Sequence, residues 1–242
     1  MASPSAAAML STWERGVTQS AVERGLTLMA LAGPETDRNL LGSLNIGARD
    51  RRLLKLRESC FGTRMTGLMS CKQCGEELEI ELTTTELLAL ESTQSTDLVA
   101  QGDDYEVRLR LPDSHDLLKI ADVMPDRAER MLLQACVVSA TVGGAGIAPD
   151  LLPSALVAAA ARRLGDAEPF ADLQLTFTCM SCGHRGQAPF DIVPFLWLEL
   201  DAWAERALRE VHVLASAYGW GEREILALSP LRRAQYLRML QA

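Results

Sequence analysis

The segments Cys71-Lys72-Gln73-Cys74-Gly75 and Cys179-Met180-Ser181-Cys182-Gly183 share one pattern and are expected to lie together in the folded chain. Each is a Cys-x-x-Cys pair followed by glycine, and roughly a hundred residues separate the two. A Cys-x-x-Cys turn presents two thiolates to one metal ion, and glycine permits the tight backbone that follows. Two such turns complete a tetrahedral shell. The sequence therefore predicts one Zn²⁺ ion bound by the four cysteines Cys71, Cys74, Cys179 and Cys182.

Strand patterns flank both turns. Residues 78–82 alternate between apolar and charged side chains directly after the first pair. Residues 172–178 lead into the second pair, and residues 186–190 lead out of it. Strict alternation is typical of a strand with one buried face. We therefore expect a zinc-ribbon-like element made of short antiparallel strands and of the two Cys-x-x-Cys-Gly turns, which we call the knuckles. Four thiolates leave no open coordination position, so the predicted zinc is structural.

Other roles for the cysteines remain open. Both pairs could stay reduced without metal, or act in redox chemistry, but a redox Cys-x-x-Cys opens a helix in a βαβ unit and these pairs are bracketed by strands. His184 could replace a cysteine as ligand, although its position favours the hairpin surface. Cys60 and Cys136 lie in apolar helical patterns and are expected to be buried, inert thiols.

The composition favours a mostly helical α+β fold. The chain has 242 residues, 48% of them hydrophobic and only 5% aromatic, which suits a core of aliphatic side chains. Cysteines arranged for metal binding indicate a reducing compartment. No run of eighteen apolar residues occurs, and the first residues lack the charged region of a signal peptide. We therefore expect a cytoplasmic protein without membrane contact.

Periodicity predicts the elements. After an irregular lead over residues 1–9, we expect one helix over 10–31 and another over 45–61. Residues 105–111 alternate and predict a strand that pairs in the same sheet as 78–82. The remaining helices are expected at 84–91, 114–122, 127–140, 151–163, 191–218, 222–228 and from Ser229-Pro230 onward. The predicted regions are an N-terminal helical region (1–70), a zinc ribbon with a helical insert (71–190) and a C-terminal helical tail (191–242).

Charge and motif content argue against two classes of function. The net charge is −8, and Glu76, Glu77, Glu79 and Glu81 outnumber Lys72 and Arg185 around the knuckles, so we expect no nucleic-acid binding. None of the three histidines stands in a catalytic motif, and we predict no catalytic residue and no enzyme activity. An enzyme with a structural zinc would need a polar pocket in the insert.

Three segments carry a resemblance to a known family. They are Leu10 to Gly16 with Trp13-Glu14-Arg15, Arg49 to Glu58, and the tail from Phe195 through Tyr218-Gly219-Trp220 to Tyr236. The chain resembles baseplate-associated proteins of contractile phage tails and extracellular contractile injection systems, in particular T-even-type baseplate hub or hub assembly chaperone proteins. The resemblance implies a non-catalytic structural or assembly role, baseplate or hub subunits as partners, and incorporation in a phage-tail-like particle.

Two alternatives remain open, one for the function and one for the role of the tryptophans. The alternative function is a zinc-ribbon protein that binds nucleic acid or has a regulatory role. The four tryptophans, Trp13, Trp197, Trp203 and Trp220, suit contact surfaces for partners, or else belong to the core of the chain itself.

Overall fold

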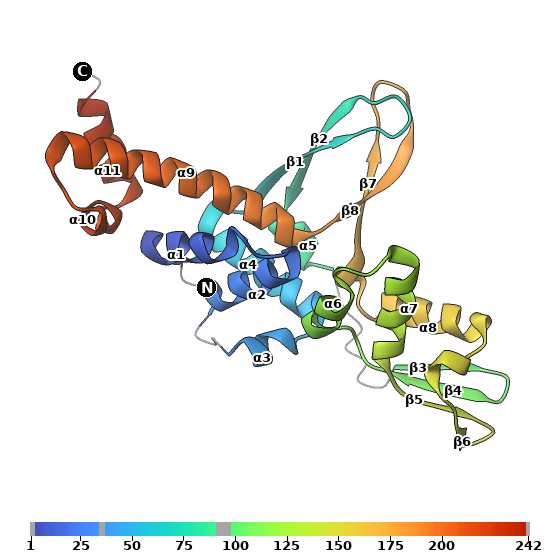
Figure 1. Ribbon diagram of the computed structural model, residues 1–242. Helices are drawn as coiled ribbons and strands as arrows, with labels where there is room; N and C mark the ends of the chain where they lie inside the picture. Colours follow the sequence, from blue (N-terminus) through green and yellow to red (C-terminus); the bar gives the residue numbers. More distant parts are fainter. Residues whose placement is uncertain (1–2, 34–36, 91–97, 241–242) are drawn as a thin grey trace.

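The computed structural model describes residues 3–33, 37–90 and 98–240 (Figure 1). It is an α+β fold, mostly helical, with small antiparallel sheets. The α-helices are α1 (Ala6–Gly16), α2 (Ala21–Leu31), α3 (Arg38–Gly42), α4 (Ile46–Phe61), α5 (Thr84–Leu88), α6 (Ser114–Ile120), α7 (Pro125–Cys136), α8 (Ser154–Ala167), α9 (Ile192–Tyr218), α10 (Glu222–Ala227) and α11 (Pro230–Met239). Short 3₁₀ helices cover Pro149–Leu151 and Pro169–Asp172.

The strands form three separate sheets. The hairpin of β1 (Arg64–Ser70) and β2 (Glu77–Thr83) carries the first knuckle at its tip, and the hairpin of β7 (Leu173–Thr178) and β8 (Arg185–Phe190) carries the second. The third sheet has the order β3-β4-β5-β6, formed by Leu98–Gly102, Tyr105–Leu109, Val137–Val142 and Ala145–Gly146. The predicted partnership between 105–111 and 78–82 is wrong, because β4 pairs with β3 and β5 whereas β2 pairs with β1.

The predicted helix over 10–31 is two helices. α1 begins at Ala6, within the expected irregular lead, because the Ser5 hydroxyl accepts a hydrogen bond from the Ala8 N–H. The chain then breaks at residues 17–20, and α2 begins with a capping box in which Ser20 and Glu23 satisfy each other's backbone N–H groups. The Ser-x-x-Glu spacing was the signal for this boundary in the sequence.

The main core forms where α1, α2 and α4 pack against α9. α4 has the predicted bounds, with Asn45 as N-cap and Gly62 as C-cap, and its residues Leu53, Leu54 and Leu56 are fully buried. Figure 1 shows α9 crossing the body as the longest helix, with both hairpins rising from one side of it. The core therefore anchors the bases of the two hairpins.

The insert between the hairpins has its own smaller core. Residues from the four-stranded sheet and α8, including Val107 and Leu156, are buried together there. The helix predicted over 127–140 ends at Cys136, and the β-branched residues Val137 and Val138 begin β5 instead. The insert is thus a sheet covered by helices, more strand-rich than the sequence patterns indicate.

The tail of α9 carries a third packing unit. Gly219 adopts the left-handed conformation (φ 70°) that ends α9, and α10 and α11 fold back against its last turns. Trp220 stacks on the Tyr218 ring with their centroids 4.7 Å apart. Trp13 donates its ring N–H to Asp201 at 2.7 Å, and Trp197 and Trp203 pack in the core. All four tryptophans therefore contact their own chain.

Within the three described ranges, no helix combines the length and the apolar character needed to cross a membrane.

Candidate metal centre

The first knuckle is a tight turn between β1 and β2. The Cys71 N–H donates to the Glu76 carbonyl and the Gly75 N–H donates to the Cys71 carbonyl, each at 2.8 Å. Gly75 has φ +76°, a conformation that costs a side-chain-bearing residue roughly 1 kcal/mol or more. The glycine after the second cysteine is therefore what lets the turn close.

The second knuckle repeats this geometry between β7 and β8. The Cys179 N–H donates to the His184 carbonyl and the Gly183 N–H donates to the Cys179 carbonyl, again at 2.8 Å. Gly183 has φ +72°. Two segments far apart in the sequence thus form the same local structure, as their shared Cys-x-x-Cys-Gly pattern predicts.

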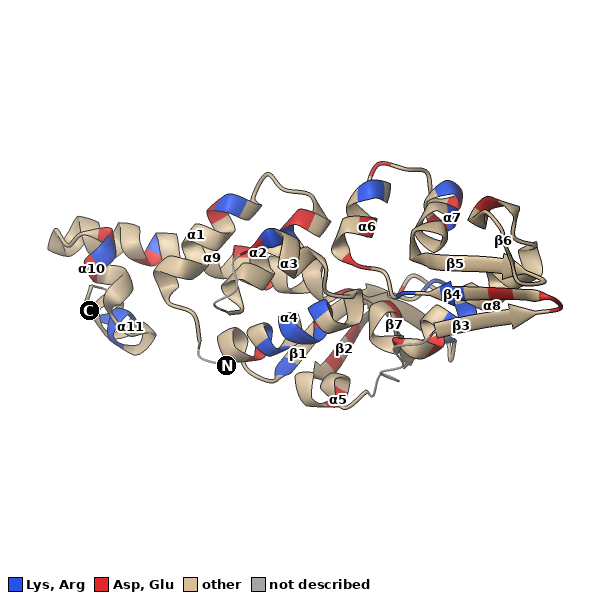
Figure 2. Ribbon diagram, turned by 90° about the horizontal axis from the view of Figure 1, so that it is seen from below, with Lys and Arg blue, Asp and Glu red and all other residues tan. Residues whose placement is uncertain are grey.

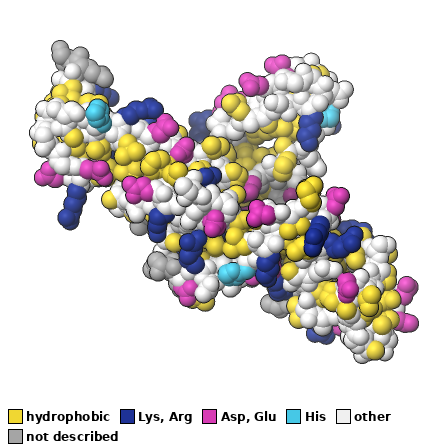
Figure 3. Space-filling model, viewed as in Figure 1, with side chains coloured by type: hydrophobic (Ala, Val, Ile, Leu, Met, Phe, Trp, Pro, Cys, Tyr) yellow, Lys and Arg dark blue, Asp and Glu magenta, His cyan; other side chains and the backbone are white. Residues whose placement is uncertain are grey.

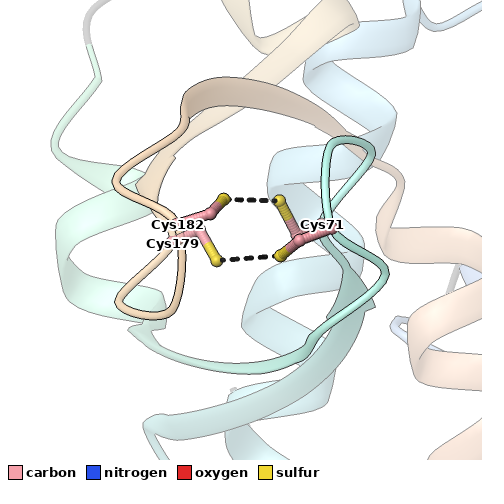
Figure 4. Close-up of side chains that lie close together, drawn as sticks. Cys71, Cys179 and Cys182 are labelled. Atoms are coloured by element: carbon pink, nitrogen blue, oxygen red, sulfur yellow. Dashed lines mark hydrogen bonds between the residues drawn. The ribbon is translucent and has the colours of Figure 1, made fainter.

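The four sulfur atoms meet where the tips of the two hairpins face each other (Figure 4). All four lie within 4.8 Å of one another. The Cys71 and Cys182 sulfurs are 3.8 Å apart, and the Cys74 and Cys179 sulfurs are 3.7 Å apart. A disulfide needs about 2.05 Å between sulfurs, whereas a tetrahedron with Zn–S bonds of about 2.3 Å has edges of about 3.8 Å. The donor set therefore fits a tetrahedral thiolate metal site.

The pKa values of the cysteines reflect their closeness to one another. The backbone N–H of Cys74, followed by that of Gln73, lowers the pKa of Cys71 to about 7. The Glu76 N–H lowers the pKa of Cys74, but the neighbouring thiols and burial together raise it to about 12. Adjacent thiolates repel one another, and a divalent cation is what allows all four to ionise together.

The site is buried on one side and open on the other. Cys71 and Cys179 are 2% and 1% exposed, whereas Cys74 and Cys182 reach solvent. The His184 side chain is outside the sulfur cluster and has its ring against the edge of Phe177. An incoming ion therefore has access through the side of Cys74 and Cys182.

The two remaining cysteines lie elsewhere. Cys136 is fully buried, and Cys60 is half-buried beside the main core. Burial raises the pKa of both thiols, that of Cys136 to about 11, so both are protonated at neutral pH. Cys136 is thus buried as expected, Cys60 is only partly so, and the inertness of both thiols stays a prediction.

Sequence patterns did not indicate how the hairpins are supported. A Cβ atom at Gly67 of β1 would lie 3.9 Å from one edge atom of the Phe195 ring, and Phe195 contacts Phe190 at the end of β8. The Arg57 guanidinium donates to both Glu199 oxygens, at 2.8 and 2.6 Å, and to the Gly62 carbonyl just before β1. These contacts join segments that are far apart in the sequence. The periodicity of a single segment cannot predict such contacts.

Comparison with protein families matches residues 29–197 to the family described as T4 bacteriophage base plate protein. The match covers both knuckles, the insert and the Arg49 to Glu58 segment, but not the Leu10 to Gly16 segment or α10 and α11. No curated protein and no solved structure matches the chain. Because the matched residues make up well over half of the sequence, the chain belongs to the T4 bacteriophage base plate protein family.

Proposed function

We propose that the chain is a non-catalytic structural or assembly protein of the baseplate of a phage-tail-like contractile injection system, and that one structural zinc ion links its two cysteine-bearing hairpins. Its partners are baseplate or hub subunits, which it meets in the cytoplasm before or during incorporation in the particle. The observation that carries this proposal is the family match across both knuckles, together with the four sulfurs gathered at the tips of the two hairpins.

The proposed zinc is bound by Cys71, Cys74, Cys179 and Cys182. Spacings of 3.7 and 3.8 Å between sulfurs match a closed tetrahedral shell, which offers no position for water or substrate. The ion would hold the two hairpins together and so fix the path of the chain on both sides of the insert. Its contribution is to stability and shape.

The insert cavity supports a non-catalytic role. A cavity of about 350 Å³ lies between α7, α8 and the start of α4, and its lining is mainly aliphatic, with Leu132, Leu133 and Leu164. Its buried carboxylate, Glu168, already accepts hydrogen bonds from Arg51 at 2.8 Å and from the Phe170 N–H. That group is held in an ion pair with Arg51.

Charge opposes the nucleic-acid alternative. Figure 2 shows acidic residues along β2, where Glu77, Glu79 and Glu81 are all exposed. A phosphate backbone would be repelled from this face of the hairpin. A salt-sensitive complex with DNA or RNA at micromolar affinity would favour the alternative instead.

Metal analysis with co-purification tests the proposal. The tagged chain, expressed with the whole tail gene cluster, should carry one zinc per chain and retain baseplate subunits after purification. Cys179→Ser should lose the zinc, whereas Met180→Ala, in the same turn and 91% exposed, should keep both zinc and partners. Zinc-free wild-type protein of normal stability would refute the metal site. Zinc-bound protein that retains no tail subunit would refute the baseplate role.

A further inference from the structure

The exposed side of α11 is apolar and basic. Leu231, Arg232, Gln235, Arg238 and Met239 are all exposed, and their spacing places them on one side of the helix. Leu231 is 71% exposed and Met239 is 65% exposed. We call Leu231, Arg232, Arg238 and Met239 the basic face.

The charges of the basic face are not neutralised by the chain. α11 contains no Asp or Glu, and its third arginine, Arg233, is buried and donates to Glu210 at 2.7 Å. Within the described residues, the Arg232 and Arg238 side chains form no ion pair. Two free guanidinium groups beside two exposed apolar side chains are suited to an acidic surface with an apolar centre.

The outer side of the β1–β2 hairpin is such a surface. Leu68, 75% exposed, lies directly opposite Glu79 in the antiparallel register. Glu77 and Glu81 flank this pair along the same side of β2. Figure 3 shows acidic side chains along this outer edge. We call Leu68, Glu77, Glu79 and Glu81 the acidic face. Arg64 pairs with Glu81 of this face at 3.4 Å, and both side chains of the pair are highly exposed.

The two faces cannot meet within one chain. Gly67, in the middle of β1 and next to Leu68, lies beside Phe195 in the first turn of α9, whereas Arg233 of α11 bonds to Glu210. These positions are separated by about 22 Å along the helix axis. Figure 1 shows α11 beside the far end of α9, away from the tip of the hairpin.

We propose that the basic face of one copy docks on the acidic face of a second copy of this chain. Arg232 and Arg238 would pair with the β2 glutamates, and Leu231 and Met239 would cover Leu68. Because the two surfaces differ, the contact is heterologous, and each copy keeps one free face for a further copy. Repetition of the contact gives a ring if the rotation closes. Exposed ion pairs make the association salt-dependent.

Sedimentation velocity of the full-length chain tests this contact. The average mass of the wild type should rise above the monomer mass of 26.4 kDa with increasing concentration at low salt, and return to it in roughly 1 M NaCl. Arg232→Glu with Arg238→Glu should abolish the rise, and so should Glu77→Lys with Glu79→Lys. Arg206→Glu with Arg223→Glu changes the charge equally at exposed positions outside the basic face and should leave the rise intact.

An equimolar mixture of the two charge-reversed proteins gives the decisive result. One protein is acidic on both faces and the other is basic on both, so the mixture should associate although neither protein does so alone. Circular dichroism identical to the wild type shows that the variants fold. A wild type that stays monomeric at every concentration, reversed variants that still self-associate, or a mixture that remains monomeric would each overturn the proposal.

Discussion

Gly16 and Gly165 are helical glycines in opposite surroundings. A Cβ atom at Gly16 would lie 2.4 Å from two ring atoms of the buried Trp197, whereas one at Gly165 in α8 would meet nothing within 4 Å. Gly16→Ala should therefore lower the free energy of unfolding by about 1–3 kcal/mol through overpacking. Gly165→Ala should raise it by up to about 1 kcal/mol, because alanine favours a helix. Urea denaturation of both variants measures the change in the free energy of unfolding. If the two substitutions changed this free energy by the same amount, the contacts of Gly16 with Trp197 would be contradicted.

The ion pair of Asp116 with Arg110 should make the free energy of unfolding depend on pH. It accepts two hydrogen bonds from Arg110, at 2.6 and 2.8 Å, and its side chain is 1% exposed. Burial alone raises the pKa of Asp116, but the Arg110 bonds, the Asp113 N–H and Lys119 outweigh it and lower the pKa to about 2. Because the folded-state pKa lies below the ordinary value of 3.8, this stabilisation is present above pH 3.8 and is lost as the pH falls towards 2.

Asp116→Asn should accordingly cost about 2 kcal/mol at pH 7. The difference from the wild type should shrink as the pH falls from about 4 towards 2, as measured by urea denaturation across that range. Lys119→Ala removes only a partner whose side chain is 65% exposed, and should cost less than about 0.5 kcal/mol. A difference between wild type and Asp116→Asn that stays constant with pH would contradict the lowered pKa.

The cysteines show how much of the candidate metal site could be predicted from the sequence. Cys-x-x-Cys-Gly at two places was sufficient to predict that four side chains meet, because few other structures require that spacing. It did not predict which sulfurs are adjacent, Cys71 with Cys182 and Cys74 with Cys179, since the arrangement of the two hairpins in space sets this. Binding of zinc by these residues stays a prediction.

Several capped helices were predictable, but α2 was missed as a separate helix despite its capping box, and β1, which depends on distant partners, was missed as well. Asn45 and Gly62 bound α4 as expected, and Ser229 caps α11. β1 was missed because its sequence, Arg64–Ser70, alternates weakly and contains Gly67. It becomes a strand by pairing with β2 and by packing Met65 into the core, contacts that the segment itself does not encode.

Tyr236 anchors α11 to the end of α9. Its ring meets Trp220 edge-on at 4.9 Å and Tyr218 at 5.7 Å between centroids. A helix as short as α11 is marginal alone, so Tyr236→Ala should release α10 and α11 locally. Amide hydrogen exchange over residues 222–239 should accelerate by about 100-fold, with the main core unchanged. Gln235→Ala, an exposed neighbour, is the control. Global destabilisation by Tyr236→Ala would show that the tail is part of the main folding unit.

At the scale of the whole molecule, the hairpins and the insert form one loop closed by the cysteines. The predicted regions 1–70, 71–190 and 191–242 stay a prediction, but the buried clusters follow a related division: a main core joining both ends of the chain, a separate core in the insert, and a packing unit at the tail. The sequence could not indicate that residues before 70 and after 190 share one core, because α4 and α9 meet only in the folded chain.

Removal of the metal should therefore lower the stability of the whole molecule without unfolding its helices. The Cys74–Cys179 link spans 105 residues, and closing a loop of that length contributes about 4–5 kcal/mol by restricting the unfolded chain. The main core contains none of the four cysteines, so the helices should persist at room temperature. A chelator should lower the melting temperature by about 10–20 °C in calorimetry while far-UV circular dichroism changes little.

Cys74→Ser provides the control for this experiment. The variant should already melt at the lower temperature and should not respond to the chelator, because one ligand of the closed shell is gone. A melting temperature that is unchanged after elemental analysis confirms complete loss of zinc would show that the cysteines do not stabilise the fold. Complete loss of helical signal on chelation would instead show that α4 and α9 depend on the hairpins, contrary to the separation between the main core and the cysteine cluster.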